Sequence, residues 1–311
     1  MAARVTTEGV RPMDIKYYQT AWSDLKNSPG WFKKLMILAL LNFIPIFGQI
    51  VTFGYLYGWA RDIAWGVHNP LSERVLGNED GKLYRRGFYA LLIMIVFSLV
   101  PGAIDLLGSV ISGGGIATSI GLLAGNSSTS AAVAPGAFAL VTGTLFGALS
   151  LVAQFAVVLF GWVAIMRMSI YDDLGAGFQI STIWKMMRHD LNGLLRILGM
   201  SILLVCIVGF IFVIVATIVT VIFAFGAISV GAIGGSNAQI MSALAGIGLI
   251  AVPIVLAVLF FAIVASLYIE ALVARAMGYW TYQFGVAQWQ GKDDPLPFEY
   301  QAQTTQYPPQ Y

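Results

Sequence analysis

"FIPIFGQIVTFGYLYGWARD", residues 43–62, interrupts an apolar run with Pro45 and Gly48 before that run is long enough to cross a bilayer. Proline removes a backbone donor and disfavours helix at the preceding residue, and glycine allows a tight reversal. The stretch therefore predicts a helical hairpin with its turn at Pro45 and Gly48. The first arm, residues 31–44, would rise only about 20 Å, short of a hydrocarbon core of roughly 30 Å. We expect a short or re-entrant hairpin, and a long helix kinked at Pro45 is the alternative.

The composition outside this stretch is that of a membrane protein. Of 311 residues, 58% are hydrophobic and only 10% are charged, which lies far outside the range of water-soluble domains. Four further apolar runs are long enough to span a bilayer, at residues 87–112, 137–166, 194–230 and 240–274. The alternating pattern of a membrane barrel is absent, so helices must satisfy the backbone in lipid. We expect an all-α integral membrane protein with six membrane segments in three helical hairpins.

The positions of the basic residues predict the topology. Lys and Arg are found in the N-terminal segment, in the C-terminal tail, and in or beside the stretches between hairpins. Residues 113–136 and 231–238 contain no charged side chain, which by the positive-inside rule places them outside. Both termini are then cytoplasmic, and we expect a location in a bacterial or archaeal cytoplasmic membrane. The net charge of +2 is too small to suggest nucleic acid as a partner.

The chain reads as three parts. Residues 1–30 form a polar, amphipathic N-terminal segment in the cytoplasm, and residues 31–287 form the helical membrane domain. Residues 288–311 are rich in Pro, Gln and Tyr with few aliphatic side chains, which is typical of a disordered cytoplasmic tail. That tail is either a docking peptide or inert.

Residues 178–198 have the pattern of an amphipathic helix lying at the membrane interface. Apolar side chains recur at helical spacing on one face, and Lys185, Arg188 and Arg196 lie on the other. Basic residues beside an apolar face favour an anionic leaflet, by about 1 kcal/mol per charge. The three residues are therefore candidates for a lipid interface, with ordinary anchoring as the alternative.

Each hairpin also ends on an aromatic-rich helix that carries one arginine: Arg61, Arg167 and Arg275. This pattern indicates either an internal repeat or a generic interfacial belt.

Several motifs resemble an uncharacterised family of prokaryotic multi-pass membrane proteins, domain of unknown function 4013. They are Trp31 followed by two lysines, "IPIFG" from Ile44, "GYLYGWAR" from Gly54, and "DGKLYRRGF" from Asp80 with Pro101 after it. The resemblance implies a membrane protein and carries no activity.

The sequence offers little chemistry. His68 and His189 lie in separate connectors without a cysteine or carboxylate cluster, no serine has a recognisable base partner, and no glycine-rich stretch has the context of a phosphate loop. We therefore expect no catalytic, cofactor or metal site. The leading hypothesis is a non-enzymatic membrane module that assembles with or positions other membrane or envelope components. The alternative is a transporter or channel subunit for a neutral or lipid-like cargo, and a membrane enzyme comes third. The expected partners are membrane lipids, with a protein or a second copy as further candidates.

Two acids lie within apolar stretches, Asp105 and Glu270. Counting from Gly87 places Asp105 about 27 Å along its helix, near the outer headgroups, where its role is structural. Glu270 lies near the inner end of its helix, where pairing with Arg196 or Arg275 would lower the cost of its charge. Participation in an ion path is the alternative.

Overall fold

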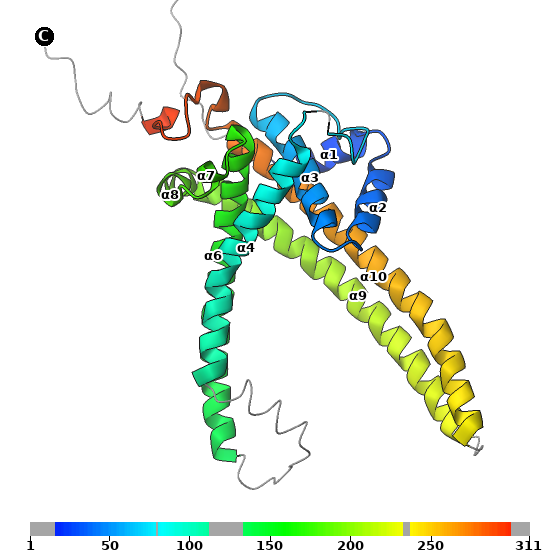
Figure 1. Cartoon of the computed structure of the whole chain (residues 1–311). Coiled ribbons are helices and arrows are strands. Elements are labelled where there is room, and N and C mark those ends of the chain that lie inside the picture. The colour runs from blue at the N-terminus through cyan, green and yellow to red at the C-terminus, as the bar shows by residue number, and fades with distance from the viewer. Residues whose placement is uncertain (1–15, 79, 112–132, 233–236, 300–311) are drawn as a thin grey trace, which may run out of the picture. The chain divides into compact units, whose positions relative to one another are not determined.

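The computed structural model describes residues 16–78, 80–111, 133–232 and 237–299. Within these ranges every regular element is a helix (Figure 1). The chain divides into two compact units: unit 1 comprises residues 1–87 and 190–311, and unit 2 comprises residues 88–189. Unit 1 is therefore discontinuous in sequence, and unit 2 is inserted into it.

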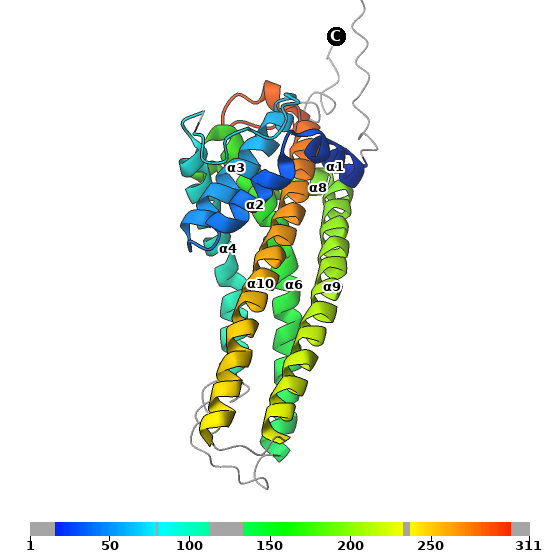
Figure 2. The ribbon, with the colours of Figure 1, turned by 90° about the vertical axis from the view of Figure 1, so that its right-hand side faces the viewer.

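In the described part of the chain, four helices are long and apolar enough to cross a membrane. They are α4 (Leu83–Ile111), α6 (Val133–Tyr171), α9 (Leu191–Ala232) and α10 (Asn237–Tyr282). Each contains the described residues of one of the four long apolar runs, which confirms that these runs form helices. α4 continues through Pro101 without a break, so this proline does not start a new helix. α9 and α10 run side by side in unit 1 (Figures 1 and 2).

The stretch around Pro45 reverses the chain between two short helices. α2 (Trp31–Leu41) and α3 (Phe47–Ala64) pack against each other, and the Asn42 amide reaches across the break to Thr52 Oγ1 at 2.9 Å. In one continuous helix these two residues would lie about 15 Å apart. The alternative of a single kinked helix is therefore wrong. Neither arm is among the helices long and apolar enough to be a candidate span.

The turn uses its glycine differently from the prediction. The backbone with positive φ falls on Ile46, at 67°. Gly48 lies in the first turn of α3, where a Cβ atom would collide with the carbonyl oxygen of Leu41. Gly48 is therefore required for close approach of the two arms and not for a left-handed backbone. Pro45 lies within the break, and its carbonyl accepts a hydrogen bond from the Phe47 amide at 2.7 Å.

Small residues let α3 pack closely on its neighbours in unit 1. A Cβ atom at Gly54 would meet the Leu83 carbonyl in the first turn of α4, and one at Gly87 would meet the carbonyl of Ile50. On the other side, Gly278 of α10 lies against the backbone of Ala60. The core of unit 1 thus surrounds α3.

The N-terminal helix α1 (Tyr17–Asn27) adds a further layer to this core. Its buried side chains are Tyr17, Ala21 and Leu25, at helical spacing, and they pack mainly towards α10. Trp22 meets Trp31 and Tyr268 edge to face, with ring centroids 5.5 and 5.6 Å apart. The apolar face of the predicted amphipathic N-terminal segment therefore packs within the protein.

The predicted continuous helix over residues 178–198 is interrupted at Asp190. α8 (Ile180–His189) ends there, and α9 begins at the next residue. The Asp190 carboxylate accepts a hydrogen bond from the Gly193 amide at 2.9 Å, which is the geometry of a helix N-cap. Arg196 therefore belongs to a candidate span in unit 1, whereas Lys185 and Arg188 lie on α8 in unit 2.

Unit 2 is built from α4 after Gly87, α6, the short helix α7 (Leu174–Gly177) and α8. Ile183, Met186 and Met187 form the buried face of α8, which packs on α6. Arg167 of α6 is fully buried, and donates to Gln179 Oε1 at 2.6 Å and to the Ala176 carbonyl at 3.4 Å. The arginine thus joins the end of α6 to the connector that follows it.

The first part of the predicted disordered tail, residues 288–299, is packed within unit 1. A 3-10 turn, η1 (Val286–Gln288), follows α10, and the Trp289 indole donates to the Phe284 carbonyl at 3.0 Å. Leu296 is buried, and the Phe298 ring lies 5.8 Å from that of Phe284. These apolar side chains are few, but they lie close to the end of α10, against which they pack. Residues 300–311 lie outside the described ranges.

Candidate functional site

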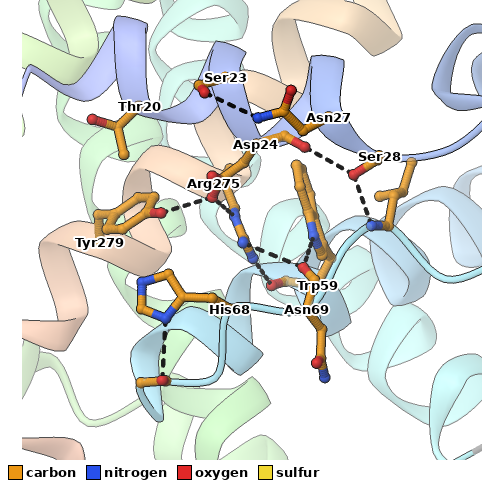
Figure 3. Close-up of polar contacts among 12 residues, drawn as sticks. Thr20, Ser23, Asp24, Asn27, Ser28, Trp59, His68, Asn69, Arg275 and Tyr279 are labelled. Carbon is orange, nitrogen blue, oxygen red and sulfur yellow. Dashed lines mark hydrogen bonds and ion pairs between the residues drawn. The ribbon is translucent and has the colours of Figure 1, made fainter.

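A buried arginine, Arg275, contacts several polar groups at one end of unit 1, and Figure 3 shows these contacts. The side chain is 1% exposed. Its Nε donates to Asp24 Oδ2 at 2.7 Å, its Nη1 donates to the Trp59 carbonyl at 2.9 Å, and the guanidinium lies 4.3 Å from the centroid of the Trp59 ring. Its Nη2 also reaches the Asn69 carbonyl at 3.4 Å. Because a buried charge is costly unless it is paired and hydrogen-bonded, this set of partners is what allows Arg275 to be buried.

The partners of Arg275 are themselves held in place. Asp24 also accepts a hydrogen bond from the Tyr279 hydroxyl at 2.7 Å. Ser28 Oγ donates to the Asp24 carbonyl at 2.8 Å and accepts from the Leu71 amide at 2.9 Å. Lys34 Nζ donates to the Leu71 carbonyl at 2.8 Å. Burial lowers the pKa of this lysine, and the negative charge of Glu73 raises it by less. We call this region, with α1, residues 65–82 and the adjoining ends of α3 and α10, the polar end of unit 1.

The polar end contains a cavity of about 510 Å³. It is lined by Gly54, Tyr55, Gly58, Trp59, Arg61, Asp62, Asn69, Pro70, Leu71, Ser72, Glu73, Gly77, Asp80, Leu83 and Arg86. Arg86 is 3% exposed, and its Nη2 lies 2.6 Å from Asp80 Oδ2, while Arg61 Nη1 lies 3.9 Å from the same oxygen. Gly58 makes room for the Arg86 guanidinium. We call this space the polar cavity.

The pKa values of two acids of the polar cavity, Asp62 and Asp80, are shifted in opposite directions. Burial raises the pKa of Asp62, and Arg61, Asn69 and more distant arginines only partly oppose it. Burial acts on Asp80 in the same direction, but hydrogen bonds from Arg86 and the Lys82 amide, with the two arginine charges, outweigh it and lower the pKa of Asp80. The cavity thus presents both charge signs, which suits a polar or zwitterionic group.

A second, smaller cavity of about 200 Å³ adjoins Glu270. We call it the Glu270 cavity. The predicted pairing of Glu270 with Arg196 or Arg275 is wrong, because neither arginine reaches its buried Oε1 and Arg275 is bound to Asp24 and the backbone. Glu270 Oε1 is buried, and no atom of the described residues forms a hydrogen bond with it. This acid lies one to two helical turns before Arg275, on the face of α10 that meets the first hairpin.

The remaining predicted site residues lie apart from these cavities. Lys185 and Arg188 are exposed on α8, beside the half-exposed ring of Trp184. Arg196 is exposed on α9 and close to Tyr17: burial and the Asp190 charge raise the pKa of that tyrosine to about 12, and Arg196 opposes them. Asp105 is exposed on α4. The basic lipid-interface candidates are therefore divided between two units.

The sequence did not predict the two short ion pairs of the polar end, Asp24 with Arg275 and Asp80 with Arg86. Asp24 and Arg275 are 251 residues apart, and no local pattern links them. The pair of Asp80 and Arg86 is closer in sequence and lies within "DGKLYRRGF", which the sequence marked only as a family feature. His68 forms a local contact, a hydrogen bond from its ring Nδ1 to the Gly66 carbonyl at 3.3 Å. Among the described residues no group of three or more His, Cys, Asp or Glu side chains is placed to hold a metal ion.

These observations define an all-helical protein with four candidate membrane spans and a polar, hydrogen-bonded end in unit 1. Residues 37–217, more than half of the chain, match the family described as protein of unknown function DUF4013, and the chain belongs to that family. The family resemblance of the sequence motifs is thereby confirmed. The matched segment contains the whole lining of the polar cavity but neither Asp24 nor Arg275. Neither the curated proteins nor the solved structures give a match.

Proposed function

We propose that this protein is a non-enzymatic, multi-pass membrane module that assembles with or positions other components of a membrane or envelope. The observation that carries the proposal is the uneven distribution of packed surface. The polar end of unit 1 is buried and cross-linked by hydrogen bonds, whereas no residue in the most apolar window of α9 is buried. A protein with a packed polar end and a membrane helix whose side chains are exposed could bind other membrane proteins through that helix.

Open glycines on α9 support a protein partner in addition to lipid. A Cβ atom at Gly199 or Gly209 would meet nothing within 4 Å. Glycine weakens a helix relative to alanine, so its presence in open space is unfavourable for the isolated chain. Interfaces between membrane helices are rich in small residues, because these let two backbones approach closely. The face of α9 around Gly209 is therefore the part of the module that we assign to a partner or a second copy.

The charge map supports a finer arrangement. The three hairpins α2–α3, α4–α6 and α9–α10 would give six membrane segments, with the first hairpin short or re-entrant and both termini in the cytoplasm. The polar end then faces the cytoplasm of a bacterial or archaeal cell. On α8, the exposed Lys185 and Arg188 beside Trp184 suit the headgroups of an anionic leaflet.

Photo-crosslinking in native membranes tests assembly. A benzophenone amino acid at Phe210, which is 67% exposed on α9 beside Gly209, should give a discrete protein adduct in the host cell. The same group at Leu256, which is 50% exposed on α10, serves as the control and should label lipid alone. Copies with two different tags then separate a second copy from another protein. Lipid adducts alone at Phe210 would contradict assembly through this face.

A transporter or channel subunit for a neutral or lipid-like cargo is the second candidate. The observation that favours it is the break at residues 42–46, which brings polar groups of α2 and α3 against a candidate span. Transporters use interrupted helices in this way at their substrate sites. Uptake of a labelled cargo by proteoliposomes, lost when Ser266→Trp fills the Glu270 cavity beside this break, would favour this candidate over the module.

A further inference from the structure

The Glu270 cavity combines an acid oxygen without a hydrogen-bond partner and several polar groups from α3, α10 and the residue that follows α2. Its polar lining consists of Asn42, Gln49, Thr52, Ser266 and Glu270. Asn42 follows α2, Gln49 and Thr52 lie on α3, and the last two lie on the candidate span α10. Glu270 Oε1 is buried and has no hydrogen-bond partner among the described residues. A carboxylate with one oxygen buried in this way is costly, and a compensating group would lower that cost.

Two of the lining side chains, Asn42 and Ser266, have their donors occupied and present oxygen lone pairs to the cavity. The Asn42 amide nitrogen donates to the Leu38 carbonyl and to Thr52 Oγ1, both at 2.9 Å, which leaves the amide oxygen as an acceptor. The Ser266 hydroxyl donates to the Ala262 carbonyl at 2.9 Å, so its remaining capacity is also to accept. Together with the carboxylate, these oxygens form an acceptor-rich lining.

The charge of the cavity is also one-sided. None of the described residues that line it is a lysine or an arginine. Arg275, the nearest arginine along α10, is occupied by Asp24 and the Trp59 carbonyl. An anion would therefore meet repulsion, and a cation would find both charge compensation and oxygen ligands, which hard cations prefer.

We propose that the Glu270 cavity binds a small monovalent cation, either a sodium ion or a protonated primary amine. Glu270 is the counter-ion, and oxygens of Asn42, Thr52 and Ser266 are the further ligands. A single carboxylate balances one positive charge, whereas a divalent ion would leave a net charge in a region of low dielectric. A volume of about 200 Å³, against about 30 Å³ for one water, holds such a cation with several waters or a short aminoalkyl group.

Binding of radioactive sodium to the purified full-length protein in detergent tests the site directly. At pH 7.5 the protein should bind ²²Na⁺ saturably, and Glu270→Gln should weaken the affinity by about 100-fold, since it removes the counter-ion. Asp105→Asn is the matched control, because it removes the exposed acid of α4 by the same chemical change, and it should bind as the unaltered protein does. Ser266→Ala, at an exposed position bonded only within α10, should weaken binding by a few fold with the fold intact.

Competition experiments against bound ²²Na⁺ distinguish a site for alkali ions from a site for protonated amines. Displacement of ²²Na⁺ by potassium but not by ethanolammonium identifies an alkali-ion site, and displacement by ethanolammonium identifies an amine site. An amine site that excludes sodium is detected as thermal stabilisation by ethanolammonium that is absent in Glu270→Gln. If neither cation binds, or if both bind Glu270→Gln as tightly as the unaltered protein, the proposal is overturned. Stabilisation that depends on pH alone would overturn it as well, because Glu270 would then take only a proton.

Discussion

At the scale of single residues, the contact between Asp24 and Arg275 is the one on which the polar end depends most. Arg275 is almost fully buried and Asp24 is partly exposed. Asp24→Asn keeps the shape but removes the counter-charge, so we expect a loss of about 2 kcal/mol in the free energy of unfolding. Differential scanning fluorimetry in detergent should show a lower melting temperature. Asp105→Asn is the control, and equal melting temperatures for the two variants would contradict this role.

The acids of the polar cavity should respond to the same substitution in opposite directions. Asp62 has a raised pKa, so its ionised form destabilises the folded state as pH rises above the unfolded value of about 3.9. Asp80 has a lowered pKa, so its stabilising contribution is present above about 3.9 and is lost as pH falls through the lower folded value. At pH 7, Asp62→Asn should raise the melting temperature and Asp80→Asn should lower it.

Melting curves at pH 4 provide the internal check for this pair. There the gain from Asp62→Asn should have largely disappeared, whereas the loss from Asp80→Asn should persist. Shifts of the same sign for both variants at pH 7 would show that the charges are not balanced as described.

Single residues were also where sequence reasoning was least complete. Arg275, Arg167 and Glu270 were all noted for their positions at helix ends. Their partners were not predicted, because Asp24 is distant in sequence and because the partners of Arg167 include a backbone carbonyl that carries no sequence signal. A charged residue in an apolar stretch indicates that it needs a partner, but only the fold determines which residue that partner is.

At the scale of helices, the glycines of α3 and α6 make a contrast that can be measured. Gly54→Ala places a methyl group against the Leu83 carbonyl, and overpacking of this kind costs about 1–3 kcal/mol. Gly143→Ala on α6 meets nothing within 4 Å, and alanine favours helix by about 0.5–1 kcal/mol over glycine. We therefore expect the first variant to melt lower and the second to melt slightly higher. A lower melting temperature for Gly143→Ala would reveal a partner on that face.

Helix locations were predicted well where length and apolarity decide them. All four long apolar runs became helices, and Pro45 marked a true reversal. The amphipathic period over residues 178–198 concealed the break at Asp190, because apolar spacing continues across it and only a short capping signal marks the new helix. For residues 288–299 the composition did not indicate the packing that is observed, since a few apolar side chains such as Leu296 suffice when α10 ends beside them.

At the scale of the whole molecule, the topology proposal rests on the distribution of charge. Single cysteines at Ser128 and Ser236, in a Cys206→Ser background, should both react with an impermeant maleimide added to intact cells. Both positions lie outside the described residues, in the two stretches that contain no charged side chain. A cysteine at Ser72, beside the polar cavity, is the control and should react only after permeabilisation. Labelling at only one of the two loops would rule out three hairpins.

The division of the chain into a discontinuous unit 1 and an inserted unit 2 has a consequence for biosynthesis. Residues 88–189 leave the ribosome as one contiguous piece, whereas unit 1 begins with α1 and is completed only when α10 emerges. Until then, the carboxylate of Asp24 and the carbonyls of Trp59 and Asn69 lack the guanidinium of Arg275. Every chain truncated before residue 275 exposes that polar gap. Completed chains therefore have these groups paired with Arg275, and we expect truncated chains, in which the groups stay unpaired, to be cut faster by proteases.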